Sequence, residues 1–181
     1  MKQLWAPWRM VYIDQGSGDN GCIFCAKQRQ IDQREALVLT QTKHSVVMLN
    51  KYPYNNGHLL LAPKRHESKL DDLPAEEHAD LQDALRRSVT IVRAVLKPGG
   101  LNLGMNLGKC AGAGVEDHLH WHVVPRWEGD TNFMPVVAET RVMPQHLLDS
   151  YDRLKPHFDS LARGETRSVQ YDSRKSVKDA G

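Results

Sequence analysis

Two short apolar segments near the start of the chain, 36–41 and 45–50, predict a pair of strands joined by a tight turn. A loop rich in turn-forming residues follows, and then the continuous apolar run 58–63 predicts a buried strand. Because the links between these strands are short, antiparallel pairing is favoured. The first third of the chain is therefore expected to form one edge of an antiparallel sheet.

A long helix is expected next, beginning at Pro74, because proline suits the first helical position. The sequence Pro98-Gly99-Gly100 ends it. Its apolar residues recur at helical spacing and form one face: Leu81, Leu85, Val89, Val92 and Leu96. The helix should therefore lie with this face against the sheet.

The pattern then predicts strands at 101–108 and 117–125, and a second helix that starts near Pro144 and runs through Leu154. The expected fold class is α+β, with a meander-like antiparallel sheet of about five strands and the long and C-terminal helices on one face. The central domain is expected to span residues 22–161.

The two ends of the chain differ from this central domain. Residues 1–21 carry Trp5 and Trp8 and are expected to form an arm that docks on the domain or on a partner, although a ligand site is an alternative. Residues 162–181 are polar and charged, which predicts a flexible tail.

Composition narrows the function classes. The 181 residues carry a formal net charge of only +2, so charge gives no case for nucleic-acid or membrane binding. No apolar run approaches the ~20 residues of a membrane helix. The first residues lack the apolar core of a signal peptide, so a cytoplasmic location is expected.

The three cysteines, Cys22, Cys25 and Cys110, argue against a disulfide framework because their number is odd. Cys22 and Cys25 form a Cys-x-x-Cys pair, which is either half of a metal site or a redox pair. A redox pair of the thioredoxin type should follow a strand, whereas this one follows a turn-rich loop. The spacing therefore favours metal.

Candidate chemistry concentrates in residues 118–122, which read His-Leu-His-Trp-His. On a strand, side chains alternate between faces, so three imidazoles would share one face while Leu119 and Trp121 point into the core. Imidazole is the side chain most easily tuned to work near neutral pH. A half-exposed strand that happens to carry histidine is the alternative, but three of the nine histidines fall in this window.

A glycine-rich loop, 108–114, immediately precedes the histidines. Glycines allow backbone N–H groups to approach an anion closely, so the loop is a candidate phosphate site. An ordinary hairpin loop is the alternative interpretation.

Together these residues resemble a known family. Asn50, Gly57-His58, Asn106-x-Gly108, Ala111-Gly112 and the His-x-His-x-His run resemble the histidine triad (HIT) family of nucleotide hydrolases and transferases over roughly residues 20–130. Flanking segments, including Val124-Pro125-Arg126-Trp127, resemble the branch that contains bacterial diadenosine tetraphosphate phosphorylases.

The resemblance implies a catalytic role for three histidines. His120 would attack the α-phosphorus of a nucleotide and form a covalent nucleotidyl-imidazole intermediate. His122 would help to hold the phosphate. His58 would orient His120 or polarise a phosphate oxygen.

The resemblance also implies a nucleotide-binding set. Asn50 would bind ribose and Asn106 phosphate, and Trp127 would either shape the acceptor pocket or pack in the core or at a dimer contact. Backbone N–H groups in the glycine loop would face the developing charge: those of Gly112, Ala113 and Gly114.

Two departures from the common family pattern bear on which molecule accepts the nucleotidyl group from the intermediate. Ala113 stands where many members have glutamine, and one extra residue separates Gly112 from His118. Both features resemble the phosphorylase branch, in which phosphate rather than water accepts the nucleotide.

By the same resemblance, a structural zinc ion would be bound by Cys22, Cys25, His66 and His118, with a pair of reduced cysteines as the alternative. A two-fold homodimer is also implied. No organic cofactor is implied.

The leading hypothesis is thus a nucleotidyl hydrolase or transferase that cleaves dinucleoside polyphosphates. The alternatives are a phosphoramidate or dinucleoside polyphosphate hydrolase, a nucleotide-binding module with weak catalysis, and a zinc-stabilised interaction domain.

Overall fold

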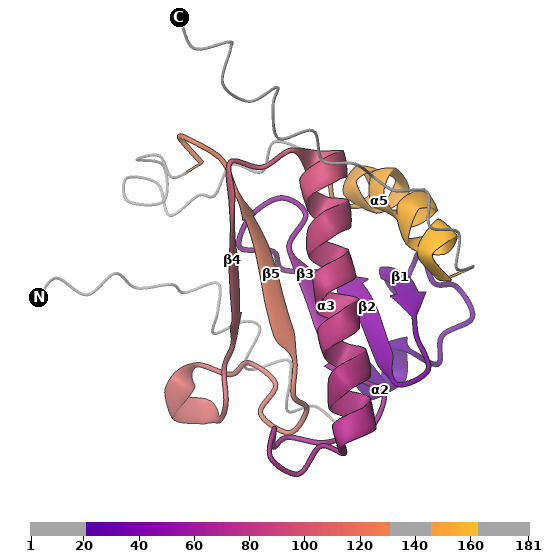
Figure 1. Cartoon of the computed structure of the whole chain (residues 1–181), viewed down its shortest axis with the longest axis vertical. Coiled ribbons are helices and arrows are strands. Elements are labelled where there is room, and N and C mark those ends of the chain that lie inside the picture. The colour runs from indigo at the N-terminus through magenta and orange to yellow at the C-terminus, as the bar shows by residue number, and fades with distance from the viewer. Residues whose placement is uncertain (1–20, 131–145, 163–181) are drawn as a thin grey trace, which may run out of the picture.

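A single five-stranded antiparallel sheet organises the molecule, with strands in the order β1-β2-β3-β5-β4 (Figure 1). The structure, a computed structural model, describes residues 21–130 and 146–162. The strands are β1 (Val38–Gln41), β2 (Ser45–Leu49), β3 (Leu59–Pro63), β4 (Gly100–Met105) and β5 (Trp121–Arg126). The helices are α2 (Ile23–Lys27), α3 (Ala75–Leu96) and α5 (Leu147–Ala162), with a 3-10 turn, η1 (Lys109–Ala111).

The described residues confirm the α+β class, the five strands and both longer helices. The predicted arm with Trp5 and Trp8, the predicted helix start at Pro144 and the tail after residue 162 lie outside the described residues. None of the described helices combines the length and apolar content needed to cross a membrane.

The sheet is not a simple meander, and here the prediction was wrong. β1, β2 and β3 follow one another as neighbours, but α3 then carries the chain to the far edge, where β4 forms. β5 returns antiparallel between β3 and β4. The strand that carries the last histidine therefore lies inside the sheet.

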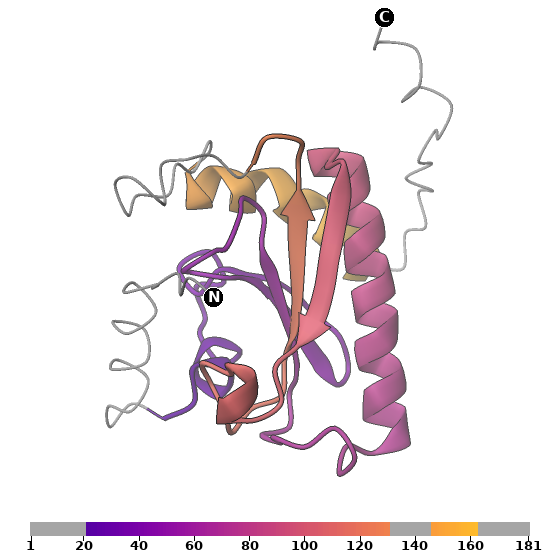
Figure 2. The same cartoon turned by 90° about the vertical axis from the view of Figure 1, so that its left-hand side faces the viewer.

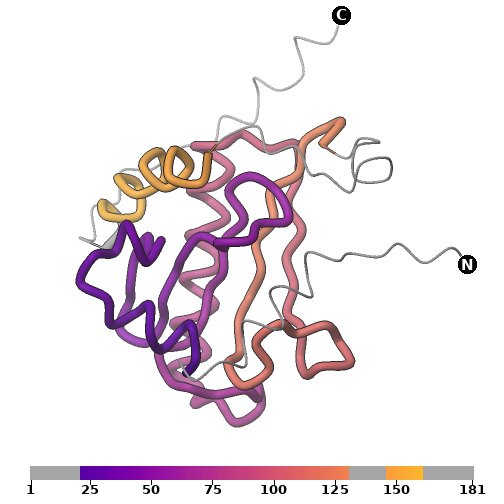
Figure 3. Tube along the Cα trace, turned by 180° about the vertical axis from the view of Figure 1, so that it is seen from behind, coloured from indigo at the N-terminus to yellow at the C-terminus, as the bar shows by residue number. Residues whose placement is uncertain are grey.

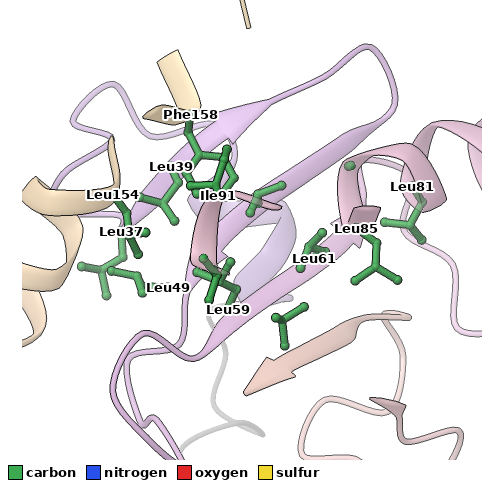
Figure 4. Close-up of a cluster of buried hydrophobic side chains, with 14 of the residues drawn as sticks. Leu37, Leu39, Leu49, Leu59, Leu61, Leu81, Leu85, Ile91, Leu154 and Phe158 are labelled. Atoms are coloured by element: carbon green, nitrogen blue, oxygen red, sulfur yellow. The ribbon is translucent and has the colours of Figure 1, made fainter. Parts of the chain in front are cut away.

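The face of the sheet that carries α3 and α5 holds the larger hydrophobic cluster (Figures 1 and 4). Alternate residues of the strands point to this side, among them Leu59 and Leu61 of β3. They pack against apolar residues of both helices, including Leu81, Leu85, Ile91, Leu154 and Phe158. We call this cluster the α3-side core.

The intervening strand residues point to the opposite face, where α2 packs (Figures 2 and 3). This second cluster, called the α2-side core below, consists of Phe24, Ala36, Val38, Val46, Met48, Leu60 and Ala62. The prediction that the long and C-terminal helices share one face is therefore confirmed, and α2, which was not predicted, lies on the other face. Because α2 has only five residues, its pattern carried no helical period to recognise.

Both ends of α3 follow from the sequence. Pro74 is the N-cap rather than the first helical residue, and Glu76 and Glu77 occupy the first turn, where the helix dipole favours acidic groups. Lys97 closes the helix in the left-handed conformation at φ 50°. The predicted boundaries are thus correct to within one residue.

α5 fastens the loop that precedes β3. Its Ser150 hydroxyl donates to Oδ1 of Asn56 at 2.8 Å, and both residues are buried. The phenol of Tyr151 donates to the carbonyl of Val38 at 3.0 Å, and burial raises the pKa of Tyr151 to about 12. The first bond fixes the loop 50–58, which ends at His58, against α5, and the second joins α5 to β1.

β5 begins later than predicted. The strand starts at Trp121, so of the three histidines only His122 lies on it. His118 and His120 lie in the segment just before the strand, where no neighbouring strand of the described sheet pairs with them. Leu119 is buried in the α3-side core and the partly buried Trp121 packs against it, as the alternation predicted.

Candidate active site and metal centre

Three imidazoles, those of His58, His120 and His122, gather on the α2 side of the sheet. His122 lies opposite Leu60 of β3, which belongs to the α2-side core, and directly opposed residues share a face. The ring centroids of His120 and His122 are 4.9 Å apart, and those of His58 and His122 are 5.2 Å apart. The structure thus brings together the three histidines predicted to be catalytic.

Hydrogen bonds assign the tautomers of His58 and His122. The backbone N–H of Tyr54 donates to Nδ1 of His58 at 3.0 Å, so this nitrogen is an acceptor. The proton of neutral His58 therefore lies on Nε2, which contacts Nδ1 of His122 at 3.0 Å. His58 donates in this pair, which leaves the proton of neutral His122 on Nε2.

His120 has the opposite tautomer. Its Nδ1 contacts the carbonyl oxygen of His118 at 2.8 Å, and a carbonyl can only accept. Nδ1 of His120 therefore carries the proton, and Nε2 carries the lone pair. Burial lowers the pKa of His120 below its usual value, which favours this neutral form. A neutral imidazole with an unprotonated Nε2 is chemically suited to nucleophilic attack.

The loop before His58 shapes one side of this cluster. The ring of Tyr54 stacks on His122, with centroids 5.7 Å apart and planes 18° apart, and lies 4.8 Å from His58. No role was predicted for Tyr54. The signal that it offered is its place in the segment 52–58, one of the flanking segments that resemble the phosphorylase branch.

Gly57 occupies a left-handed position in this loop, close to α3. Its φ is +69°, and an added Cβ would lie 2.3 Å from Cδ1 of Leu96 on α3. Glycine adopts this conformation without strain, whereas an alanine would be strained and would also displace the end of the Leu96 side chain.

The four residues predicted to bind metal also lie together. The potential ligand atoms of Cys22, Cys25, His66 and His118 all lie within 4.8 Å of one another. Nδ1 of His118 is 3.1 Å from Sγ of Cys22 and 3.7 Å from Sγ of Cys25. Zn–S and Zn–N bonds of ~2.3 and ~2.0 Å in tetrahedral geometry put sulfur and nitrogen about 3.5 Å apart. The donor set and its spacing therefore fit a tetrahedral metal ion.

The surroundings of His118 also fit a metal ligand. Its Nε2 contacts the carbonyl of Pro63 at 2.8 Å and therefore carries the proton, which leaves the lone pair on Nδ1, facing the thiols. Metal-binding histidines typically donate their other N–H in this way. Burial lowers the pKa of His118 and raises the pKa of the Cys22 thiol.

Both asparagines predicted to bind nucleotide are hydrogen-bonded to the site loops. Oδ1 of Asn50 accepts the N–H of Tyr52 at 2.9 Å, and its Nδ2 lies 3.3 Å from Nδ1 of His58. Nδ2 of Asn106 donates to the carbonyl of Gly112 at 3.3 Å. Asn50 thus borders the histidine cluster, and Asn106 braces the glycine loop.

The glycine loop uses some of its own amides. The N–H of Gly112 donates to Lys109 at 2.8 Å, and the N–H of Ala113 donates to Gly108 at 3.3 Å, which closes η1. Among the described residues, the N–H of Gly114 makes no such backbone bond. Two of the three amides predicted to face the substrate are thus bonded within the turn in this structure, and a role of the three amides at a phosphate stays a prediction.

Trp127 follows β5 and packs against the α3-side core. Its backbone N–H donates to Oδ2 of Asp130 at 3.1 Å. This packing favours the core interpretation of Trp127, and a nucleotide contact by Trp127 stays a prediction.

Comparison with known proteins identifies the class to which this fold and site belong. A family model described as the HIT domain matches residues 32–129. The chain belongs to the HIT family, as its histidine and asparagine motifs predicted.

Individual relatives are similar over most of the domain. The chain is 38% identical over 157 residues to the AP-4-A phosphorylase of Mycobacterium tuberculosis, covering 83% of this chain and 80% of the relative. It is 35% identical over 108 residues to an adenosine 5'-monophosphoramidase of Saccharomyces cerevisiae, covering 60% and 64%. A Zn-bound histidine triad family protein of Mycobacterium smegmatis superposes with a TM-score of 0.60 at 26% identity, covering 82% of this chain and 100% of that one.

We predict that Gly57→Ala destabilises the protein by about 2–4 kcal/mol, because it combines a strained positive φ with a steric clash. Gly129→Ala is the matched control, since Gly129 has a similar φ of +72° but has no atom within 4 Å of the added Cβ. Urea unfolding of both variants measures the difference. Equal losses of stability would show that the approach to Leu96 is not what requires glycine.

Proposed function

We propose that this protein transfers a nucleotidyl group from a dinucleoside polyphosphate, through a covalent intermediate on His120, to inorganic phosphate. The observation that carries the proposal is the tautomer of His120. Its Nδ1–H is held by the carbonyl of His118, so that the lone pair of Nε2 is available for attack.

The first step forms a phosphorus–nitrogen bond. Nε2 of His120 attacks the α-phosphorus, and the bond from that phosphorus to the bridging oxygen breaks, so that the electron pair leaves with the second nucleotide. The Nε2–H of His122 donates to a phosphoryl oxygen as negative charge develops there. His58 supports this donation, because its own Nε2–H is directed at Nδ1 of His122.

The second step reverses the first with a new acceptor. An oxygen of inorganic phosphate attacks the phosphorus, and the phosphorus–nitrogen bond breaks to regenerate His120. Diadenosine tetraphosphate and phosphate then give ATP and ADP. Similarity to an AP-4-A phosphorylase over 83% of the chain supports this choice of donor and acceptor.

Water is the competing acceptor, and a phosphoramidate is the competing substrate. The similarity to a monophosphoramidase supports this alternative. In both reactions His120 would have the same role, so the products rather than the site residues distinguish them.

We expect cleavage of diadenosine tetraphosphate to depend on phosphate and to yield equal amounts of ATP and ADP, as measured by chromatography. His120→Ala should reduce turnover by at least about 10³-fold, because it removes the nucleophile. His157→Ala, which replaces an exposed histidine of α5, should leave turnover unchanged. AMP as a product without phosphate would identify a hydrolase, and full activity in His120→Ala would refute the covalent route.

We further propose that the Cys22/Cys25/His66/His118 cluster binds a structural zinc ion. Zinc would link α2, the segment after β3 and the segment before β5. In the described sheet, no strand pairing connects these three segments. The similarity in fold to a Zn-bound family member supports this assignment.

Purified protein should contain about one equivalent of zinc per chain by elemental analysis. Cys22→Ser should lower the zinc content and cost about 3 kcal/mol, which corresponds to a fall in Tm of roughly 6–12 °C for a domain of this size. Cys110→Ser is the matched control, because Cys110 is exposed and lies outside the cluster. Loss of zinc without loss of stability would contradict a structural role.

We also propose that the protein forms a two-fold dimer through β4. This strand lies at the edge of the described sheet, and Leu103 on it is 47% exposed. An exposed edge strand with an apolar side chain is a ready surface for pairing.

Light scattering should therefore give a mass of about twice the chain mass of 20.5 kDa. Leu103→Lys should shift the protein toward monomer, whereas Ile31→Lys should not, since Ile31 is exposed but lies away from β4. A wild-type mass of a single chain would exclude the dimer.

A further inference from the structure

One side chain, Phe24, contacts both histidine sites. It lies on α2, between the two cysteines of the metal cluster, and is fully buried. Its ring centroid is 5.0 Å from that of His118, with the planes tilted by 44°. It is also 4.9 Å from that of His120, with a tilt of 36°. The ring thus bridges a predicted metal ligand and the predicted nucleophile.

Phe24 thus contacts the rings of both residues that are joined by the hydrogen bond that sets the tautomer of His120. His120 donates from Nδ1, and the backbone carbonyl of His118 accepts at 2.8 Å. A buried benzene ring against both imidazoles leaves little space for the His120 ring to rotate out of this bond. The packing therefore restrains the direction in which Nε2 of His120 points.

Phe24 is itself held from two sides. Cys22 and Cys25 approach Nδ1 of His118 at 3.1 and 3.7 Å, which anchors α2 beside the histidine segment. The ring belongs to the α2-side core, in which Val38, Met48 and Leu60 are also buried. A five-residue helix has little stability of its own, so these contacts determine where Phe24 lies.

We propose that Phe24 is a positioning residue that holds the imidazole of His120 in the orientation required for attack. This inference rests on the proposed function only in naming His120 as the nucleophile. Phe24 has no reactive group and acts through His120. The metal cluster anchors α2 and thereby fixes the position of the Phe24 ring. Through this ring the cluster also restrains the orientation of His120.

The test compares Phe24→Leu and Phe24→Met with Val46→Ala. The first two remove the aromatic contact and keep an apolar side chain. Val46→Ala removes buried methyl groups from the same core at a residue that pairs with Gln41 and Ala62, away from the histidines. For each variant, kcat, KM, zinc content and the ¹⁵N chemical shifts of the His120 ring are measured.

We expect both Phe24 variants to lower kcat by 10- to 100-fold, since small misplacements of a reacting group have effects of this size. KM should change by less than about threefold, because substrate binding does not require the attacking orientation. The ¹⁵N shifts should move from a single Nδ1–H tautomer in the wild type to a mixture of tautomers. Zinc content should stay at the wild-type level, and Val46→Ala should resemble the wild type.

Several results would overturn the proposal. These are an unchanged kcat, an equal loss in Val46→Ala, a loss of activity in proportion to a loss of zinc, or failure of both Phe24 variants to fold, which would make Phe24 a residue of the core alone. If the wild type does not cleave dinucleotides, the proposed function fails. The ¹⁵N shifts still decide whether Phe24 fixes the His120 ring.

Discussion

The hydrogen bond from Nδ1 of His120 to the carbonyl of His118 is the constraint on which the candidate chemistry depends. It decides which nitrogen of His120 carries the lone pair, and burial lowers the pKa of that ring, which favours its neutral form. It also connects two functions within three residues, since the carbonyl belongs to a predicted metal ligand. Whatever fixes the backbone at His118 therefore also fixes the direction of the nucleophile.

The three histidines of the motif are chemically different because their hydrogen-bond partners differ. His118 donates from Nε2 to Pro63, whereas His120 donates from Nδ1 to a backbone carbonyl. His122 accepts at Nδ1 from His58, which fixes its proton on Nε2. One residue type in one short segment thus offers a candidate metal ligand, a candidate lone-pair donor and a candidate proton donor. A phosphoryl-transfer site needs the last two side by side.

The sequence predicted helices and strands well where the apolar pattern was long and periodic. It predicted them less well where packing determines the presence or the bounds of the element. The 22 residues of α3 carry a clear helical period, so its ends were correct to within a residue. α2 was missed because five residues show no period. The pairing of β5 was predicted to begin too early, since alternation continues through His118 and His120 although no neighbouring strand reaches them. Tautomers, and the contacts of Tyr54 and Phe24, depend on residues that lie far apart in the chain, and no local pattern encodes them.

The two faces of the sheet have different physical roles, and this separation explains how a small domain carries so many polar groups near its centre. The α3-side core is apolar, draws on α3 and α5, and supplies most of the buried hydrophobic side chains. The α2-side core is smaller, and the imidazoles lie beside it. Buried histidines lower stability unless they are hydrogen-bonded, and here each one has a partner. The α2 side of the sheet can therefore hold several buried imidazoles, because the α3-side core stabilises the sheet without them.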